Sequence, residues 1–200
     1  LATILKEILS NNKINKKQIL LVKNIVKKIK KYHEWFIKYR DPKQTGLVSI
    51  LHPWESGYDN SPIWDSPMEK VAVEKNLKYK RVDNKVINPE FRPHNTDYDI
   101  YVTIKNKLKK YNYNPKTVFK LSLFNVVDIG FNSIFLKANK DLIILLDQFK
   151  LDKTIINKYL KITEKNLLKL YDKKKQTFFS KDLKNKRRIY VPSILSLIHI

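Results

Sequence analysis

Residues 52–65 gather the side chains of this chain that are best suited to do chemistry together. The segment, HPWESGYDNSPIWD, combines carboxylates, two tryptophans, a histidine and a glycine turn, whereas the rest of the chain is mostly Lys, Ile, Leu and Asn. Carboxyl groups can donate and accept protons, and flat aromatic rings can cover the apolar faces of sugars. Because cleavage of a glycosidic bond depends on carboxyl groups, the segment indicates a carbohydrate-cleaving site.

A second unusual segment, FRPHNTDYD, spans residues 91–99. It contains Arg92, whose forked guanidinium can pair with a carboxylate, and the ring of Tyr98. The alternative interpretation of these two residues is a salt bridge and a core tyrosine.

The histidines do not have the spacing of a metal site. They are His33, His52, His94 and His199, and the chain has no cysteine. We therefore expect neither a metal site nor a cofactor.

The chain carries a formal net charge of +22, from 41 Lys and Arg against 19 Asp and Glu. Such an excess can indicate a nucleic-acid or anionic-membrane partner. Only five of the 41 basic residues are arginines and the other 36 are lysines spread along the chain, whereas nucleic-acid interfaces favour the forked contacts of arginine. An AT-rich coding sequence favours Lys, Asn, Ile and Tyr together and explains this composition better. We expect weak, salt-sensitive polyanion binding and no specific nucleic-acid partner.

Composition also bounds the class of protein. With 42% hydrophobic residues, the 200-residue chain can bury a core and corresponds to one domain or a piece of a larger one. No apolar run reaches the roughly 20 residues that span a bilayer, and the absence of cysteine fits a reducing compartment. We expect a cytoplasmic protein without a membrane partner. Since the chain starts at Leu1 and shows no signal-peptide pattern, we also expect an internal piece of a longer chain.

Several helices must position these segments. Apolar spacing predicts a helix over residues 16–40, which Asp41-Pro42 ends because a residue before proline avoids the helical region. Its expected apolar stripe is Val22, Ile25, Ile29, Tyr32 and Phe36. Further helices are predicted over residues 96–111, 129–149 and 152–172. The expected inward residues of the last two are Phe131, Phe135, Ala138, Leu142, Leu145, Leu146 and Phe149, then Ile156, Tyr159, Leu160, Leu167, Leu170 and Tyr171.

Loops carry the unusual segments. Residues 52–68 contain three prolines, and Ser61 is expected to cap a short helix whose first residue is Pro62. Residues 69–90 are polar and look like a surface excursion, and residues 173–188 like a charged connection. The short connections between helices imply antiparallel helical hairpins.

Three segments together resemble a known family. Residues 46–65, GLVSILHPWESGYDNSPIWD, resemble the motif of mannosylglycerate hydrolase-like and glucosylglycerate hydrolase-like glycosidases, which belong with glycoside hydrolase family 63. Residues 91–101, FRPHNTDYDIY, look like the second segment of that family. Residues 128–142, DIGFNSIFLKANKDL, look like the third, with Ile129 where Pro is usual. The order and rough spacing agree, so the resemblance covers nearly the whole chain.

The resemblance implies an all-α fold, an (α/α)6 toroid of helical hairpins with the active site at one mouth. About half of such a toroid would be present, so we expect residues 1–200 to be the central part of a single catalytic domain that is truncated at both ends. It also implies an inverting α-glycosidase for a small α-glucoside or α-mannoside, such as glucosylglycerate or mannosylglycerate.

Residue roles follow from the matching motifs. The general acid of the family falls on Asp59, and Trp54 would line the sugar subsite. Arg92 and Tyr98 would bind the glycerate end in glycerate-cleaving members. The general base of the family is a Glu far downstream, which matches no residue of this chain. We therefore expect the chain alone to be weakly active or inactive, because one carboxylate cannot complete the reaction.

Other residues of the first motif are also expected at the substrate. They are Glu55, which could instead buttress the loop, Asn60, and the rings of Tyr58 and Trp64, which could desolvate the acid. The alternative, purely structural roles are an Asx-turn or helix cap for Asp59 and core packing for Trp54. Two other functions stay open: a sugar-binding protein without turnover, and a basic helical nucleic-acid-binding module, which would not explain the clustering of these residues.

Overall fold

The computed structural model describes residues 1–191, which are mostly helical and form two compact units. The first, called here the helical unit, comprises Leu1–Val48 and Ile129–Phe178. The second, called the motif unit, comprises Ser49–Asp128 and residues 179–191. All of the predicted site residues lie in the motif unit.

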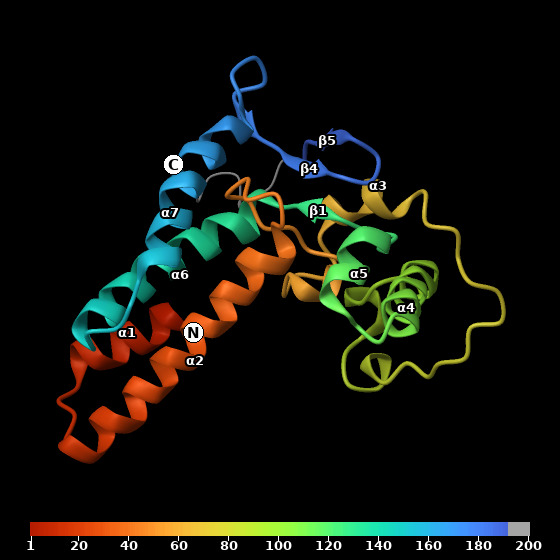
Figure 1. The fold of residues 1–200 in the computed structure, drawn as a ribbon. Coiled ribbons are helices and arrows are strands. Elements are labelled where there is room, and N and C mark those ends of the chain that lie inside the picture. The colour runs from red at the N-terminus through yellow and green to blue at the C-terminus, as the bar shows by residue number, and fades with distance from the viewer. Residues whose placement is uncertain (192–200) are drawn as a thin grey trace. The chain divides into compact units, whose positions relative to one another are not determined.

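Four α-helices build the helical unit (Figure 1). They are α1 (Ala2–Asn11), α2 (Lys16–Arg40), α6 (Ile129–Gln148) and α7 (Thr154–Leu167), followed by the 3-10 helix η5 (Leu168–Leu170) and the two-stranded hairpin of β2 (Tyr171–Asp172) and β3 (Thr177–Phe178). Helix α6 packs against α1, α2 and α7. The predicted helices at 16–40 and 129–149 are confirmed to within one residue.

Capping fixes the start of α2. Asn15 accepts a hydrogen bond from the backbone N–H of Gln18, and the Gln18 side chain accepts one from the Asn15 N–H, which is a complete capping box. At the other end, Asp41 precedes Pro42 and ends the helix. The helix boundaries therefore follow from side chains that the sequence displays.

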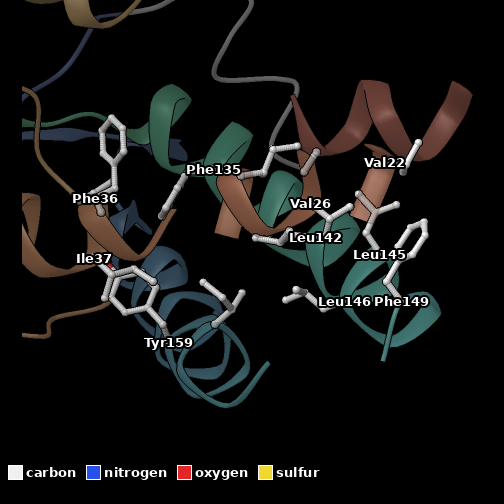
Figure 2. Packing of buried hydrophobic residues seen from close by; sticks show 14 residues of the cluster. Val22, Val26, Phe36, Ile37, Phe135, Leu142, Leu145, Leu146, Phe149 and Tyr159 are labelled. Carbon is white, nitrogen blue, oxygen red and sulfur yellow. The ribbon is translucent and has the colours of Figure 1, made fainter. Parts of the chain in front are cut away.

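Side chains of α2, α6 and α7 meet in one apolar core (Figure 2). The labelled members are Val22, Val26, Phe36, Ile37, Phe135, Leu142, Leu145, Leu146, Phe149 and Tyr159. The predicted stripe of α2 was partly wrong, because Ile25 is 37% exposed and Tyr32 is 53% exposed. The inward face is rotated toward Val26 and His33, and His33 hydrogen-bonds Asn139 of α6 at 2.8 Å. Because His33 is polar, apolar spacing alone did not place it on the buried face of α2.

The motif unit is built from short helices and a small sheet. Its α-helices are α3 (Asp65–Met68), α4 (Asn95–Lys110) and α5 (Pro115–Leu121), and its 3-10 helices are η1 (Pro53–Glu55), η2 (Pro62–Trp64), η3 (Asp83–Lys85) and η4 (Pro89–Phe91). Antiparallel strands β1 (Val126–Val127), β4 (Ser180–Asp182) and β5 (Arg187–Ile189) lie in the order β1-β4-β5. A bridge from Ile50 to Val126 ties the start of the first motif to β1. The helix predicted at 96–111 is confirmed, and so is the start of η2, where Ser61 accepts from the Ile63 N–H and Pro62 is first.

Two predictions for the C-terminal part were wrong. The helix predicted over 152–172 ends as an α-helix at Leu167, and Tyr171, expected inside, is exposed on β2. The charged connection over 173–188 contains strands β3 and β4 and the start of β5. Strands of two or three residues are too short to show an alternating pattern in the sequence.

Candidate active site

The first motif forms a tightly bonded loop. Nδ1 of His52 accepts a hydrogen bond from the Trp54 N–H at 3.0 Å, while Nε2 donates to the Tyr101 carbonyl at 2.9 Å. Burial lowers the pKa of His52 to about 4, so the ring is neutral near pH 7 and serves as a structural brace. Glu55 Oε2 accepts from the Leu51 N–H at 2.8 Å, which supports the buttress interpretation of this carboxylate. Gly57, with φ +79°, then turns the chain toward Asp59.

Trp54 presents a partly open indole. The residue is 41% exposed, and its ring lies 4.5 Å from His52, 5.8 Å from Tyr98 and 5.9 Å from Tyr101, measured between ring centroids. These neighbours hold the ring in place while one part of it stays accessible. The arrangement can serve as a platform for the apolar face of a sugar.

Trp64, in contrast, has no exposed surface. Its Nε1 donates to the Tyr58 carbonyl at 2.9 Å, and its ring stacks on Tyr58 at 5.4 Å with an interplanar angle of 22°. A sugar therefore has no access to Trp64, which corrects the expectation that this residue contacts substrate. Trp64 supports the ring of Tyr58, whose hydroxyl donates a hydrogen bond to the fully buried Asp128, and Asp128 also accepts from Ser180.

A hydrogen bond to its main chain fixes Asp59, while its carboxyl group remains accessible. The Tyr101 hydroxyl donates to the Asp59 carbonyl at 2.7 Å, which fixes the main chain at this position. The Asp59 side chain is 33% exposed, and its Oδ2 lies 3.8 Å from Nη2 of Arg92. The structure thus brings together the residues that the two motifs suggested as acid and as carboxylate ligand.

Two further predicted residues join the same region. Asn60 Nδ2 donates to the Phe91 carbonyl at 3.3 Å, so the first motif is bonded directly to the second. Tyr98, on α4, is half-buried among Trp54, Tyr79 and Tyr101.

Carboxylates gather around the Tyr101 hydroxyl. Burial, followed by the charges of Asp97, Asp59 and Asp65, raises the pKa of Tyr101. Partial burial and the neighbouring Asp97 also raise the pKa of Asp65, which favours its protonated form. The site therefore combines several acids with one accessible guanidinium and one accessible indole.

Sequence reasoning missed several residues that complete this region. Tyr101 and Asp97 lie inside the second motif and could have been found from it. Arg81 and Asp83 lie in the polar segment 69–90 and contact Arg92 or its surroundings. Asp128 opens the third motif, but nothing in its spacing tied it to Tyr58.

Among residues 1–191, no group of three or more His, Asp or Glu side chains is arranged to hold a metal ion. His199 lies outside the described residues. In the same described part of the chain, every helix is too short or too polar to cross a membrane.

Residues 1–199 match the family model described as the mannosylglycerate hydrolase MGH1-like glycoside hydrolase domain. The chain belongs to this family. Relatives include a mannosylglycerate hydrolase of Thermus thermophilus, 43% identical over 156 residues, which are 78% of this chain and 38% of the relative. A glucosylglycerate hydrolase of Mycolicibacterium hassiacum is 36% identical over 52% of this chain and 24% of the relative.

Solved structures of a family 63 mannosylglycerate hydrolase from Thermus thermophilus agree with the fold. The complexes with Tris, and with Tris and D-glycerate, both have a TM-score of 0.94 and 35% identity, and cover 99% of this chain and 48% of the solved chain. The chain thus spans about half the length of the solved relative and less of the curated ones. The family predicted from the three motifs is confirmed.

Proposed function

We propose that the protein carrying this chain is an inverting α-glycosidase that hydrolyses a small α-glucoside or α-mannoside. Glucosylglycerate and mannosylglycerate are the first candidates, because relatives of this family are named for these two substrates. Asp59 is the general acid that protonates the leaving oxygen. The observation that carries the proposal is the accessible Asp59 carboxyl group, 3.8 Å from the guanidinium of Arg92.

Each end of such a substrate has a fitting partner. A sugar ring fits the exposed part of Trp54, and a glycerate carboxylate fits the fork of Arg92 through charge-assisted hydrogen bonds. Tyr98, packed between these two parts of the site, would contact the glycerate. Asn60 and Tyr58 flank the acid, whereas the Glu55 carboxylate is already used by the loop.

An inverting reaction requires a second carboxylate, roughly 6.5–9.5 Å from the acid, to activate water. We propose that this base comes from outside these 200 residues and that the complete domain is an (α/α)6 toroid of which the chain forms about half. The substrate partner is then a small carbohydrate. A cytoplasmic location stays a prediction.

The test uses the protein expressed from the full reading frame, with mannosylglycerate and glucosylglycerate as substrates. Proton NMR follows the anomer that is released first. We expect the β-anomer, and we expect Asp59→Asn to lower kcat by about 10²–10⁴-fold, the usual contribution of general acid catalysis.

Asp65→Asn is the matched control, because Asp65, the first residue of α3, is another carboxyl group of the same motif. It should retain most of the activity. Release of the α-anomer would exclude inversion, and loss of activity in Asp65→Asn but not in Asp59→Asn would move the acid role to Asp65. A folded protein that binds these sugars without hydrolysing them would favour a binding function.

A further inference from the structure

The polar segment before the second motif docks on the site through alternate residues. Tyr79, Arg81 and Asp83 follow one another at a spacing of two, with Asp83 as the first residue of η3. The Tyr79 hydroxyl donates to Asp99 at 2.5 Å, and Arg81 and Asp83 contact the surroundings of Arg92. A segment that looks like a surface excursion in the sequence is therefore attached to the site.

Asp83 joins two arginines. Its Oδ2 lies 2.6 Å from Nη2 of Arg81 and 3.1 Å from Nε of Arg92, and its Oδ1 accepts from Nε of Arg81 at 3.2 Å. The hydrogen bonds from Arg81 first, and then that from Arg92, hold the pKa of Asp83 well below its usual range. Asp83 is therefore charged at every pH at which the protein would be assayed.

Arg81 fixes the position of this carboxylate. Its Nη1 donates to the Pro93 carbonyl at 2.8 Å and to Asn95 Oδ1 at 3.0 Å, both at the start of α4. Its guanidinium also lies 4.4 Å over the ring of Tyr98. Because the guanidinium of Arg81 binds Asp83 as well as the start of α4, it holds Asp83 in a fixed position next to Tyr98.

The bond to Asp83 also determines which nitrogens of the Arg92 guanidinium can bind a ligand. Nε of Arg92 is occupied by Asp83, while Nη1 and Nη2 make no hydrogen bond within residues 1–191. Nη2 lies on the side of Asp59, at 3.8 Å from its Oδ2. Nη2, one of the two terminal donors of the guanidinium, is thus on the side of the acid.

We propose that Asp83, held by Arg81, is a positioning residue that directs the two terminal nitrogens of Arg92 toward the carboxylate of the substrate. This inference rests on the proposed function, in which Arg92 binds that carboxylate. Specificity for a carboxylated aglycone would therefore depend on a residue outside all three recognised motifs.

Whether Asp83→Asn strengthens or weakens anion binding distinguishes a positioning role from a purely electrostatic one. Removal of a negative charge beside Arg92 would by itself strengthen the binding of an anion. If Asp83 positions the guanidinium, its loss frees Arg92 to turn onto Asp59, and anion binding weakens instead. A loss of affinity in Asp83→Asn can therefore be assigned to orientation.

The experiment measures D-glycerate binding by calorimetry with the protein from the full reading frame, for wild type, Asp83→Asn, Asp83→Glu, Asp99→Asn and Arg92→Met. We expect Asp83→Asn to weaken binding by about tenfold or more, as misplaced binding groups do. Asp83→Glu, which keeps the charge, should recover part of the affinity. Asp99→Asn is the matched control, since Asp99 binds the same segment through Tyr79 but does not touch Arg92, and it should bind D-glycerate as the wild type does.

A second readout is the ratio of kcat/KM for mannosylglycerate to that for mannosylglycerol, in which a neutral hydroxymethyl group replaces the carboxylate. The ratio should fall in Asp83→Asn and stay unchanged in Asp99→Asn. Equal or tighter glycerate binding by a folded Asp83→Asn protein overturns the positioning role. If Arg92→Met also binds glycerate as the wild type does, the carboxylate site of the proposed function is itself wrong.

Discussion

The two tryptophans of the first motif show how one residue type takes two roles within a single loop. Trp54 is 41% exposed beside three aromatic rings, whereas Trp64 is fully buried on Tyr58 and Phe124. The sequence predicted a clustered site but could not separate the two, because both follow a proline-containing turn. Their difference arises only when η2 directs Trp64 into the core of the motif unit.

Substitution of each tryptophan by alanine should therefore affect a different property. Trp64→Ala should lower the free energy of unfolding by about 3–5 kcal/mol, as loss of a buried aromatic does. Trp54→Ala should change stability far less and raise the KM for mannosylglycerate, since an aromatic contact contributes about 1 kcal/mol. Urea denaturation and steady-state kinetics on both variants measure this. A Trp54→Ala protein with unchanged KM would contradict the platform role.

At the same scale, the sequence draws attention to the accessible residues of the candidate site and not to the residues that hold them in place. Asp59, Arg92 and Trp54 belong to motifs with an unusual composition and could be recognised. Asp83 could not, because its charge does not stand out in a polar segment and its partner Arg92 is nine positions away. Only the folded chain shows that the segment returns to the site.

At the scale of elements, the loop that follows α2 depends on one glycine. Gly46 has φ +81°, and its N–H donates to Asp41 Oδ2 at 2.6 Å. A Cβ atom at this position would lie 2.8 Å from backbone atoms of Ile162 and Thr163 in α7. The loop therefore requires glycine both for its backbone conformation and for close packing on that helix.

Gly57 provides the comparison that separates these two requirements. It has a similar φ of +79°, but a Cβ atom there would meet nothing within 4 Å. Gly57→Ala should cost about 1–2 kcal/mol, the usual strain of a left-handed alanine. Gly46→Ala should cost several kcal/mol more, because backbone atoms of α7 must move. Equal losses in thermal or urea denaturation would show that close packing at Gly46 contributes nothing.

Helices with a clear apolar periodicity could be predicted from the sequence, whereas short elements without a periodic pattern could not. The long helices α2 and α6 showed apolar periodicity and clear ends. Helix α5 was not among the predicted helices, although Asn114 caps it and Pro115 is its first residue, because a proline can end a helix as well as begin one. The short strands depend on pairing between distant segments, such as Val126 with Asp182, and local sequence carries no record of it.

At the scale of the whole molecule, the dominant property is the net charge of +22. Few of the lysines are neutralised deep in the protein, and the ion pairs that form are mostly on the surface, as between Lys140 and Glu164. A charge that is spread in this way attracts polyanions without a shaped site, and salt screens it. If the proposed substrate is correct, this charge should also bring it toward Arg92 faster at low ionic strength.

If the charge is spread and there is no shaped site, the protein should bind a DNA duplex of random sequence only weakly. Binding should be detectable at about 20 mM salt, should fall linearly on a plot of log K against log salt concentration, and should vanish near physiological salt. It should not depend on DNA sequence, and Arg92→Met should not alter it, because one of 41 basic residues contributes little. Fluorescence anisotropy over a salt series provides the measurement. Binding that persists at about 0.5 M salt, or that prefers one sequence, would require a shaped interface and would restore the nucleic-acid module as a serious alternative.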